Sequence, residues 1–337
     1  MRRILVTGGA GFIGSNFVRM LLEEQPDCLV VNLDKLTYAG NLENLTGCMK
    51  RPNHKFVKGD ICDATLVERL LDEHKIDAII NFAAESHVDR SIVEPGIFIE
   101  TNVTGTLTLL KAALNKNIER FIQISTDEVY GALGPEGKFT EETPLSPNSP
   151  YSASKAAADH LVKAFGHTWG LRYNITRCSN NYGRYQFPEK MIPLMINNAL
   201  SDKELPIYGD GLYVRDWLYV YDHCTAVWKV LTEAQPGEIY NIGGNNEKTN
   251  LEVVRLILER LGKSESLIKH VTDRPGHDRR YAIDSGKIMT ELNWQPSVTF
   301  EEGINKAIDW YIENRDWLDH VVSGEYQAYY ESMYGDR

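Results

Sequence analysis

The sequence predicts an α/β protein with a doubly wound parallel sheet and a smaller C-terminal lobe. First, short β-branched runs alternate with helical patterns from residue 3 to about 178, which is typical of βαβ units. Second, the runs 78–84 and 121–126 are almost continuously apolar, as expected of central strands covered on both faces. Third, the pattern changes after Tyr182, where prolines and glycines separate isolated helices.

The elements of the sheet follow in order along the first half of the chain. Each expected strand is a short run rich in Val, Ile or Leu, and each expected helix repeats apolar residues every three or four positions. We expect strands at 3–8, 28–34, 55–60, 78–84, 121–126 and 172–178. We expect the helices between them at 15–24, 65–74, 101–115 and 152–170. The strand at 172–178 is expected to complete the sheet.

The second half of the chain has the pattern of a smaller lobe, with helices expected at 251–262 and 303–317. We assign residues 1–180 to the first lobe and mainly 181–337 to the second, with some exchange of chain between them. An interface between two such lobes is where clefts for small molecules usually form. The acidic, tyrosine-rich tail 325–337 is expected only to pack or fray.

The acidic composition excludes several classes of partner. The 337 residues include 36 Lys and Arg against 47 Asp and Glu, a formal charge of −11. We therefore expect neither nucleic acid nor an anionic membrane as a partner. An anionic ligand would have to be held by a few local cations and backbone N–H groups. No segment approaches the ~20 apolar residues of a membrane span.

The five cysteines indicate reduced thiols in the cytoplasm. Their number is odd, and they show no C-x-x-C pair and no repeated spacing. His223 stands beside Cys224, but zinc needs three or four ligands. No metal is expected.

A glycine-rich segment follows the first strand and opens a helix at Ser15. Residues 8–14 read GGAGFIG, with Gly8, Gly11 and Gly14 in fixed spacing. Glycine is needed where a strand turns sharply, where the backbone approaches a pyrophosphate and where a helix packs close to the sheet. A glycine-rich turn without a ligand is the alternative, but the strand-turn-helix context favours a dinucleotide-binding Rossmann domain.

Two carboxylates stand at strand ends, and the first of them favours NAD over NADP. Asp34 ends the second strand, twenty residues after Gly14, where a carboxylate can accept hydrogen bonds from the adenosine ribose. Lys35 could receive a 2′-phosphate, although an ionised Asp34 would repel one. Asp60 ends the third strand and is placed either to bond the adenine amine or to close a turn.

A candidate catalytic centre combines a Tyr/Lys pair with two adjacent carboxyls. Tyr151 and Lys155 have i, i+4 spacing at the start of a helix, so their side chains share one face. The fifth strand ends in Thr126, Asp127 and Glu128, at the sheet edge where doubly wound folds bind ligands. Two carboxyls there can divide into acid and base if their surroundings separate their pKa values. A solvated acidic turn is the alternative.

Longer segments carry a resemblance that covers residues 4 to about 310. They read GGAGFIG, DKLTYAGNLENL, AAESHVDRSI, STDEVYG, SPYSASKAAADHLV, CSNNYG, FPEKMIPL, VRDWLYV and DRPGHDRRYAID. The chain thereby resembles the nucleotide-sugar branch of the extended short-chain dehydrogenases, and within it the dTDP-glucose 4,6-dehydratases. One departure is Arg184, where that family usually has proline, which puts the shape of the loop in question.

The resemblance implies a three-stage reaction on dTDP-glucose with a tightly held NAD. Tyr151, assisted by Thr126 and Lys155, would take the 4-hydroxyl proton during oxidation at C4. Glu128 would then remove the C5 proton while Asp127 protonates the departing 6-hydroxyl. Hydride return to C6 would give dTDP-4-keto-6-deoxy-glucose. The adjacent carboxyls suit this chemistry, because elimination needs an acid and a base at neighbouring carbons.

The resemblance also assigns binding residues. The implied cofactor contacts are Gly8, Gly11, Phe12, Ile13, Gly14, Asp34, Lys35, Leu36, Thr37, Asp60, Ile61, Ala83, Ala84, Ser86, Thr101, Tyr151, Lys155 and Asn181. The implied substrate contacts are Ser86, His87, Thr126, Asn180, Lys190, Met191, Pro206, Ile207, Tyr208, Arg215, Asn250, Arg274 and His277. Arg215 and Arg274 are the cations expected on the diphosphate, because guanidinium offers paired donors.

Several alternatives stay open. The helices near 102–115 and 152–168 resemble those that pair into a dimer in this superfamily, so a homodimer is expected. A 4-epimerase would use Tyr151, Lys155 and NAD without needing Asp127 and Glu128. A decarboxylase would need a carboxylate pocket, and a binding-only protein should have lost the Tyr/Lys pair or the carboxyls. The sequence does not separate thymine from uracil nucleotides, or rhamnose from other deoxysugar or amino-sugar pathways.

Overall fold

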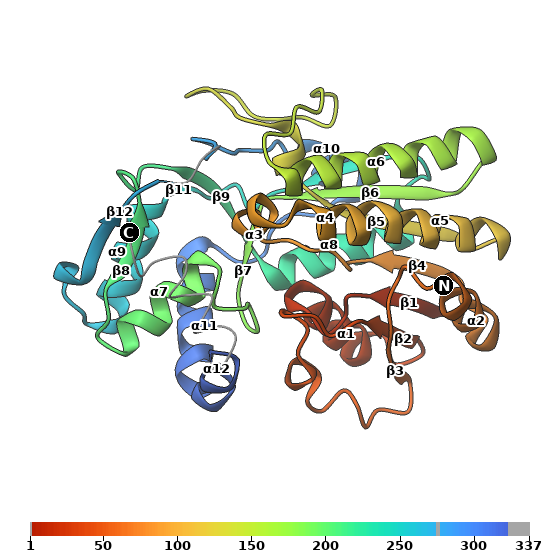
Figure 1. Ribbon diagram of the computed structural model, residues 1–337, viewed down its shortest axis with the longest axis horizontal. Coiled ribbons are helices and arrows are strands. Elements are labelled where there is room, and N and C mark those ends of the chain that lie inside the picture. The colour runs from red at the N-terminus through yellow and green to blue at the C-terminus, as the bar shows by residue number, and fades with distance from the viewer. Residues whose placement is uncertain (1, 274–276, 323–337) are drawn as a thin grey trace.

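The computed structural model describes residues 2–273 and 277–322. Its centre is a seven-stranded parallel sheet in the order β10-β6-β5-β4-β1-β2-β3 (Figure 1). The strands are β1 (Arg3–Thr7), β2 (Leu29–Asp34), β3 (His54–Lys58), β4 (Ala78–Asn81), β5 (Arg120–Thr126), β6 (Tyr173–Cys178) and β10 (Ile239–Ile242). The predicted α/β fold class is confirmed. The strand order reverses between β1 and β4, which is where such sheets open a ligand crevice.

The expectation that the strand ending at Cys178 completes the sheet is wrong. β10 pairs in parallel with β6 and places Asn241 opposite Arg177. Residues 239–242 form too short an apolar run to stand out in the sequence, and β10 reaches the sheet only because α8 (Val220–Glu233) crosses back over it. Part of the second half of the chain thus belongs to the central sheet.

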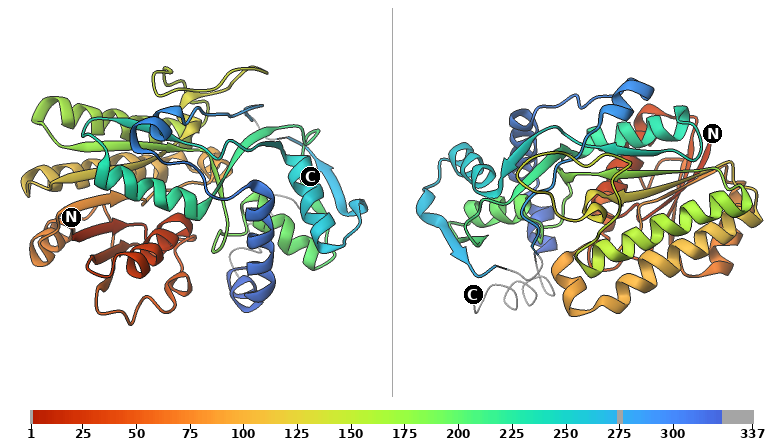
Figure 2. Two further views of the ribbon diagram at one scale, coloured as in Figure 1. Left: turned by 180° about the vertical axis from the view of Figure 1, so that it is seen from behind. Right: turned by 90° about the horizontal axis from the view of Figure 1, so that it is seen from above.

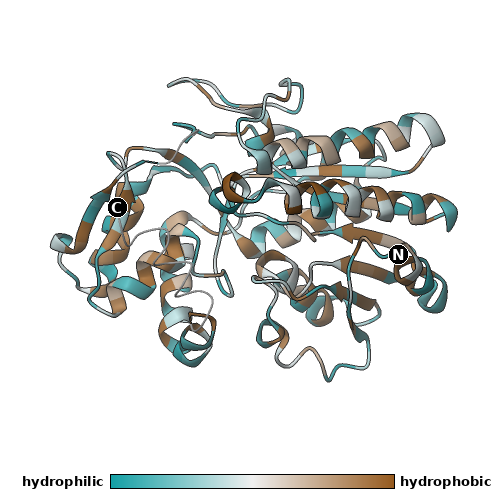
Figure 3. Cartoon of the chain, in the orientation of Figure 1, coloured by the Kyte–Doolittle hydropathy of each residue, from teal (hydrophilic) through white to brown (hydrophobic). Residues whose placement is uncertain are grey.

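Helices cover both faces of the sheet (Figures 1 and 2). One face carries α1 (Phe12–Glu24), α8 and α10 (Gly286–Leu292), and its core includes Phe17, Val227 and Ile288. The other carries α2 (Ala64–His74), α5 (Thr106–Asn115) and α6 (Pro150–Trp169), with Leu70 and Leu110 in its core. Figure 3 shows the strands β1 and β2 mostly in brown, as expected for strands buried on both sides.

Several short helices and turns lie between the longer elements along the chain. The region before α5 contains α3 (Val88–Val93), α4 (Pro95–Phe98) and a π-helix, η2 (Ile99–Gly105), so helical structure begins earlier than the predicted 101. The short turns are η1 (Leu42–Leu45), η3 (Asp127–Tyr130) and η4 (Glu265–Leu267). Likewise α1 begins at Phe12 rather than Ser15, with Gly11 as its N-cap.

In the described residues, no helix has the length and apolar character needed to cross a membrane.

A second group of elements packs around its own core. Its helices are α7 (Met191–Leu200), α9 (Asn250–Leu261), α11 (Phe300–Glu313) and α12 (Arg315–Val321). Its strands are β7 (Asn180–Tyr182), β8 (Leu205–Tyr208), β9 (Val214–Tyr219), β11 (Glu247–Thr249) and β12 (Ile268–Val271), in sheets ordered β11-β9-β7 and β12-β8. Ile196, Val254 and Ile308 lie in this core. The expectation for the tail 325–337 falls outside the described residues, and the lobe boundary at residue 180 stays a prediction.

Candidate active site

A cavity opens at the carboxyl ends of the central strands. Its lining includes the catalytic candidates Thr126, Asp127, Glu128, Tyr151 and Lys155. Of the residues expected to contact the cofactor, those that line it are Gly8, Gly11, Phe12, Ile13, Gly14, Asp34, Lys35, Thr37, Asp60, Ile61, Ala83, Ala84, Ser86, Thr101, Tyr151, Lys155 and Asn181. Leu36 is not in the lining; its backbone N–H donates to Asp34 Oδ1 at 2.8 Å. The fold therefore brings the two predicted sets together.

The glycine turn has no room for larger residues. Gly8 has φ +69°, and a Cβ there would lie 2.6 Å from the backbone nitrogen of Ala83. A Cβ on Gly14 would lie 2.2 Å from the carbonyl oxygen of Gly8. The turn can therefore be tight enough to leave the N-terminus of α1 open towards the cavity, where backbone N–H groups suit a pyrophosphate.

The end of β2 is organised by Asp34. Its carboxylate accepts hydrogen bonds at 2.8 Å from the backbone N–H groups of Ala10 and Leu36, joining the glycine turn to the next loop. Burial raises the pKa of Asp34, and these two bonds oppose that shift. Lys35 pairs with Asp60 at 2.7 Å. Because Asp60 engages the Lys35 ammonium, the residues at this end fit NAD better than a cofactor with a 2′-phosphate.

Helix α6 carries the Tyr/Lys pair in its first two turns. Ser149 and Ser152 form a capping box that begins the helix just before Tyr151. Lys155 is buried and donates from Nζ to the carbonyl oxygen of Ile124 at 2.7 Å. Burial lowers the pKa of Lys155, while Asp159 opposes the shift. Burial raises the pKa of Tyr151 well above its usual value, and the charge of Glu128 adds to the rise.

The two carboxyls at the end of β5 have different surroundings. Asp127 is 2% exposed, and its Oδ2 has no hydrogen-bond partner among the described residues. Burial raises the pKa of Asp127 well above its usual value, and the charges of Glu128 and Asp216 raise it further. Glu128 is only partly buried. Burial thus favours the neutral form of Asp127 beside a more exposed carboxyl, an arrangement suited to acid and base roles.

The expected substrate contacts divide into two groups. Ser86, Thr126, Asn180 and Lys190 line the cavity, and Lys190 Nζ donates to the carbonyl oxygen of Ser86 at 2.9 Å. The others described lie outside its lining: His87 at the start of α3, Met191 at the start of α7, Pro206, Ile207 and Tyr208 on β8, Arg215 on β9, Asn250 at the start of α9, and His277. Arg274 falls outside the described residues.

The rings of Tyr208 and His277, both in the second group, have centroids 6.0 Å apart, and other contacts join members of this group to neighbours outside it. The His277 ring stacks on Tyr213 with centroids 3.8 Å apart, and its Nδ1 lies 2.7 Å from Asp273. Arg215 donates to the carbonyl oxygen of Asp278 at 3.0 Å. Tyr208 donates from its hydroxyl to Asp89 at 3.2 Å, which links β8 to the helix beside the cavity.

The cavity also contains residues that sequence reasoning missed. They include Glu85, Cys178, Gln186, Phe187 and Glu189. Glu85 and Cys178 lie at or just beyond strand ends, so the rule that identified Thr126 could have found them. The other three belong to the loop before α7, and no pattern in the sequence places that loop over the sheet.

A family model and several curated relatives match most of this chain. The family model described as GDP-mannose 4,6 dehydratase matches residues 5–307. A dTDP-glucose 4,6-dehydratase of Xanthomonas campestris is 57% identical, over 96% of this chain and 97% of its own length. One from Shigella flexneri is 52% identical, over 99% of both chains.

The solved structures that resemble this chain include proteins with the same name as these relatives. A dTDP-glucose 4,6-dehydratase from Streptomyces venezuelae, solved with NAD and TYD bound, has a TM-score of 0.92 and 51% identity, over 95% of this chain and 99% of its own. One from Bacillus anthracis, solved with NAD, has a TM-score of 0.90 and 51% identity, over 95% and 100%. A UDP-glucose 4-epimerase from Thermotoga maritima is more distant in sequence, with 31% identity over 93% and 99% and a TM-score of 0.87.

Proposed function

The chain belongs to the GDP-mannose 4,6 dehydratase family of nucleotide-sugar enzymes, and on that premise we propose that it is a dTDP-glucose 4,6-dehydratase with tightly held NAD. The observation that carries this proposal is the pairing of Asp127 and Glu128 with Tyr151 and Lys155 around one cavity. Full-length relatives that share about half or more of the residues bear the same activity in their names. The reaction is a hydro-lyase reaction with internal return of the hydride.

The first stage is oxidation at C4. Tyr151 accepts the proton of the 4-hydroxyl, while Thr126 and Lys155 hold the phenol in place and stabilise its anion. When bound, NAD would supply the acceptor for the C4 hydride and its later donor at C6. The Lys155 ammonium favours the phenolate, against the burial that raises the pKa of Tyr151.

The second stage is elimination of water across C5 and C6. The new C4 ketone acidifies the C5 proton, which Glu128 removes. Asp127 donates its proton to the departing 6-hydroxyl, and its raised pKa favours the protonated form that this step needs. Return of the hydride to C6, with return of a proton from Glu128 to C5, would then give the 4-keto-6-deoxy sugar nucleotide.

The function is tested by incubating the purified protein with dTDP-glucose and no added NAD. Mass spectrometry and proton NMR should show the loss of one water and a new C6 methyl group. An unchanged mass with a galactose-configured product would replace the proposal with a 4-epimerase. Absence of reaction with both dTDP-glucose and UDP-glucose would favour a protein that only binds. A higher rate with UDP-glucose would show that the enzyme prefers the uracil nucleotide to the thymine nucleotide.

Replacing Asp34 by Ala should release NAD. The change removes the acceptor for the ribose hydroxyls and also the two bonds that hold the backbone of Ala10 and Leu36. We expect NAD affinity to fall at least about 10- to 100-fold, since the loss of even one hydrogen bond to a charged group costs about 1.5–3 kcal/mol. The NAD content per protomer after gel filtration measures the effect. Undiminished NAD content would remove Asp34 from this role.

The pH dependence of elimination should report the protonation of Asp127. Because the pKa of Asp127 is raised and its acid form is the active one, the elimination rate should fall as pH rises through that pKa. Asp127→Asn should lose this alkaline limb and lower elimination by about 10²-fold or more. Single-turnover C5–C6 elimination at a series of pH values is the measurement. An identical alkaline limb in the variant would assign it to another group.

The arrangement also supports a homodimer acting in the cytoplasm, with residues 1–180 as the NAD-binding lobe and mainly 181–337 as the lobe for the sugar nucleotide. Helices α5 and α6 lie side by side on the outer face of the sheet (Figure 2), and Trp169 at the end of α6 is 55% exposed. All five cysteines lie among the described residues and form no disulfide, as suits a reducing compartment. Light scattering on the purified protein tests the dimer.

A further inference from the structure

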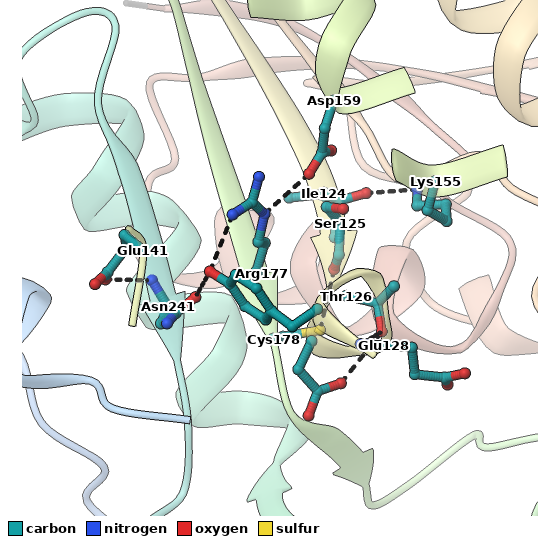
Figure 4. Close-up of polar contacts among 12 residues, drawn as sticks. Ile124, Ser125, Thr126, Glu128, Glu141, Lys155, Asp159, Arg177, Cys178 and Asn241 are labelled. Atoms are coloured by element: carbon teal, nitrogen blue, oxygen red, sulfur yellow. Dashed lines mark hydrogen bonds and ion pairs between the residues drawn. The ribbon is translucent and has the colours of Figure 1, made fainter. Parts of the chain in front are cut away.

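A polar cluster, buried except for the partly buried Glu141, lies next to the cavity residues and takes no part in the proposed steps. It consists of Tyr130, Glu141, Asp159, Arg177 and Asn241, of which Figure 4 labels the last four. These residues come from η3, the loop after it, α6, β6 and β10. None of them is among the described residues that line the cavity. Buried polar side chains are costly unless they are bonded to one another, so their arrangement calls for a functional explanation.

The hydroxyl of Tyr130 is the centre of this cluster. It donates to Asn241 Oδ1 at 2.7 Å and accepts from Arg177 Nη1 at 3.0 Å. Burial raises the pKa of Tyr130 to about 12, so the phenol is neutral and can donate and accept at the same time. Asn241 is held in turn by Glu141, which accepts from its backbone N–H at 2.8 Å, and by the carbonyl oxygen of Phe139 at 3.1 Å.

Tyr130 is also the last residue of the turn that carries the two carboxyls. Thr126 caps the start of η3, accepting from the backbone N–H of Glu128 at 3.3 Å. At the other end the Tyr130 ring stacks on Phe139, with centroids 5.0 Å apart. The chain then turns away at Gly131, where φ is +89°. The turn is therefore held at its start by Thr126 and at its end by Tyr130.

The cluster reaches the Tyr/Lys helix as well. Arg177, which is 2% exposed, donates from Nε to Asp159 Oδ2 at 3.0 Å. Asp159 lies one helical turn after Lys155 on α6. Hydrogen bonds thus join the turn of Asp127 and Glu128 to the helix of Tyr151 and Lys155 through a single phenol and a single guanidinium.

We propose that Tyr130 is a positioning residue for elimination, holding the Asp127–Glu128 turn in register with the Tyr151–Lys155 helix through Arg177 and Asn241. The proposal rests on the proposed function for its chemistry. Tyr130 does not touch the reacting atoms; it sets where the acid and the base stand. Oxidation at C4 depends on α6 and Thr126, so it should tolerate the loss of the phenol better than elimination does.

The test is Tyr130→Phe, which keeps the ring stack on Phe139 and removes the hydroxyl. Elimination in a single turnover should slow about 10-fold or more, since small misplacements of catalytic groups have effects of this size. C4 oxidation should change less than about 2-fold, so enzyme-bound NADH, read at 340 nm, should accumulate during turnover. The KM for dTDP-glucose should stay unchanged.

Tyr240→Phe is the matched control. Tyr240 lies beside Asn241 on β10, its ring is just as buried, and its hydroxyl bonds Glu291 on α10 at 2.8 Å instead. Tyr240→Phe should show the wild-type ratio of the rate of elimination to the rate of C4 oxidation. Equal slowing of both stages by Tyr130→Phe, or no slowing of either, would overturn the proposal and leave Tyr130 a structural residue.

Asn241→Ala supplies a second variant that leaves the phenol in place. It should produce the same accumulation of NADH, and the double variant should be no slower than the more affected single variant, because both variants remove the Tyr130–Asn241 hydrogen bond. Additive effects would contradict a shared role. Arg177 is a poor choice for substitution, because its removal would leave the buried charge of Asp159 uncompensated.

Amide hydrogen exchange separates this proposal from the proposed function. In the NAD-loaded protein, exchange of residues 127–131 should be faster in Tyr130→Phe than in Tyr240→Phe, whatever reaction the protein catalyses. If the wild type fails to dehydrate dTDP-glucose but this local effect is found, the proposed function fails and the anchoring role stands. Unchanged exchange at 127–131 would reject the anchoring itself.

Discussion

Tyr151→Phe is expected to stop the reaction at its first stage and to lower turnover by about 10³-fold or more. The phenol is the proposed acceptor for the 4-hydroxyl proton, and the removal of a general base has effects of about 10²- to 10⁴-fold. Phenylalanine retains the packing of the ring against Phe98, whose centroid is 6.4 Å away. The loss of turnover should therefore come from the missing proton acceptor and not from a change in folding.

The measurement is the rise of absorbance at 340 nm in a single turnover with excess enzyme. In Tyr151→Phe this rise should be almost absent, while NAD content and melting temperature stay close to wild type. Tyr173→Phe is a suitable control, because Tyr173 begins β6 at the opposite end of the strand from the cavity. A wild-type rate of NADH formation in Tyr151→Phe would show that another group takes the proton.

Glu128→Gln is expected to leave oxidation intact and to abolish exchange at C5. Glutamine keeps the size of the side chain but cannot accept a proton, so the C5 proton should stay in place once the C4 ketone has formed. Elimination should slow by about 10²- to 10⁴-fold. The enzyme should then hold NADH and the 4-ketone instead of releasing product.

Deuterium incorporation at C5, followed by proton NMR in D₂O, is the direct measurement. The matched control is Glu136→Gln, since Glu136 lies on the exposed loop after η3 and does not line the cavity. Glu136→Gln should incorporate deuterium at C5 and turn over at wild-type rates. Solvent deuterium at C5 and undiminished turnover in Glu128→Gln would remove Glu128 from the role of base.

The two substitutions together divide the reaction at the 4-ketone. Loss of NADH formation in one variant and its accumulation in the other would assign Tyr151 to oxidation and Glu128 to elimination. The positioning role of Tyr130 predicts an intermediate result, with the same accumulation as Glu128→Gln but a smaller slowing. All three variants can therefore be compared in one assay.

Much of this site could be predicted because its parts are local in sequence. The glycine turn, the carboxyl end of β2 and the i, i+4 pair on α6 each depend on a few consecutive residues whose periodicity sets strand or helix. The rule that parallel sheets bind ligands at their carboxyl ends then gathers Asp34, Thr126 and Tyr151 into one region. The roles of Asp127 and Glu128 came from the family resemblance, and stay predictions until the variants are measured.

The sequence by itself thus determined the alternation of strands and helices, the dinucleotide turn and the adjacency of the two carboxyls, because these follow from short-range spacing. Tertiary structure alone decided that β10 extends the sheet beyond β6, that Lys35 pairs with Asp60, and that Arg177 and Asn241 meet at the hydroxyl of Tyr130. These pairings join residues up to 111 positions apart. Strand order and register bring these residues together, and neither can be predicted from the local pattern of any one segment.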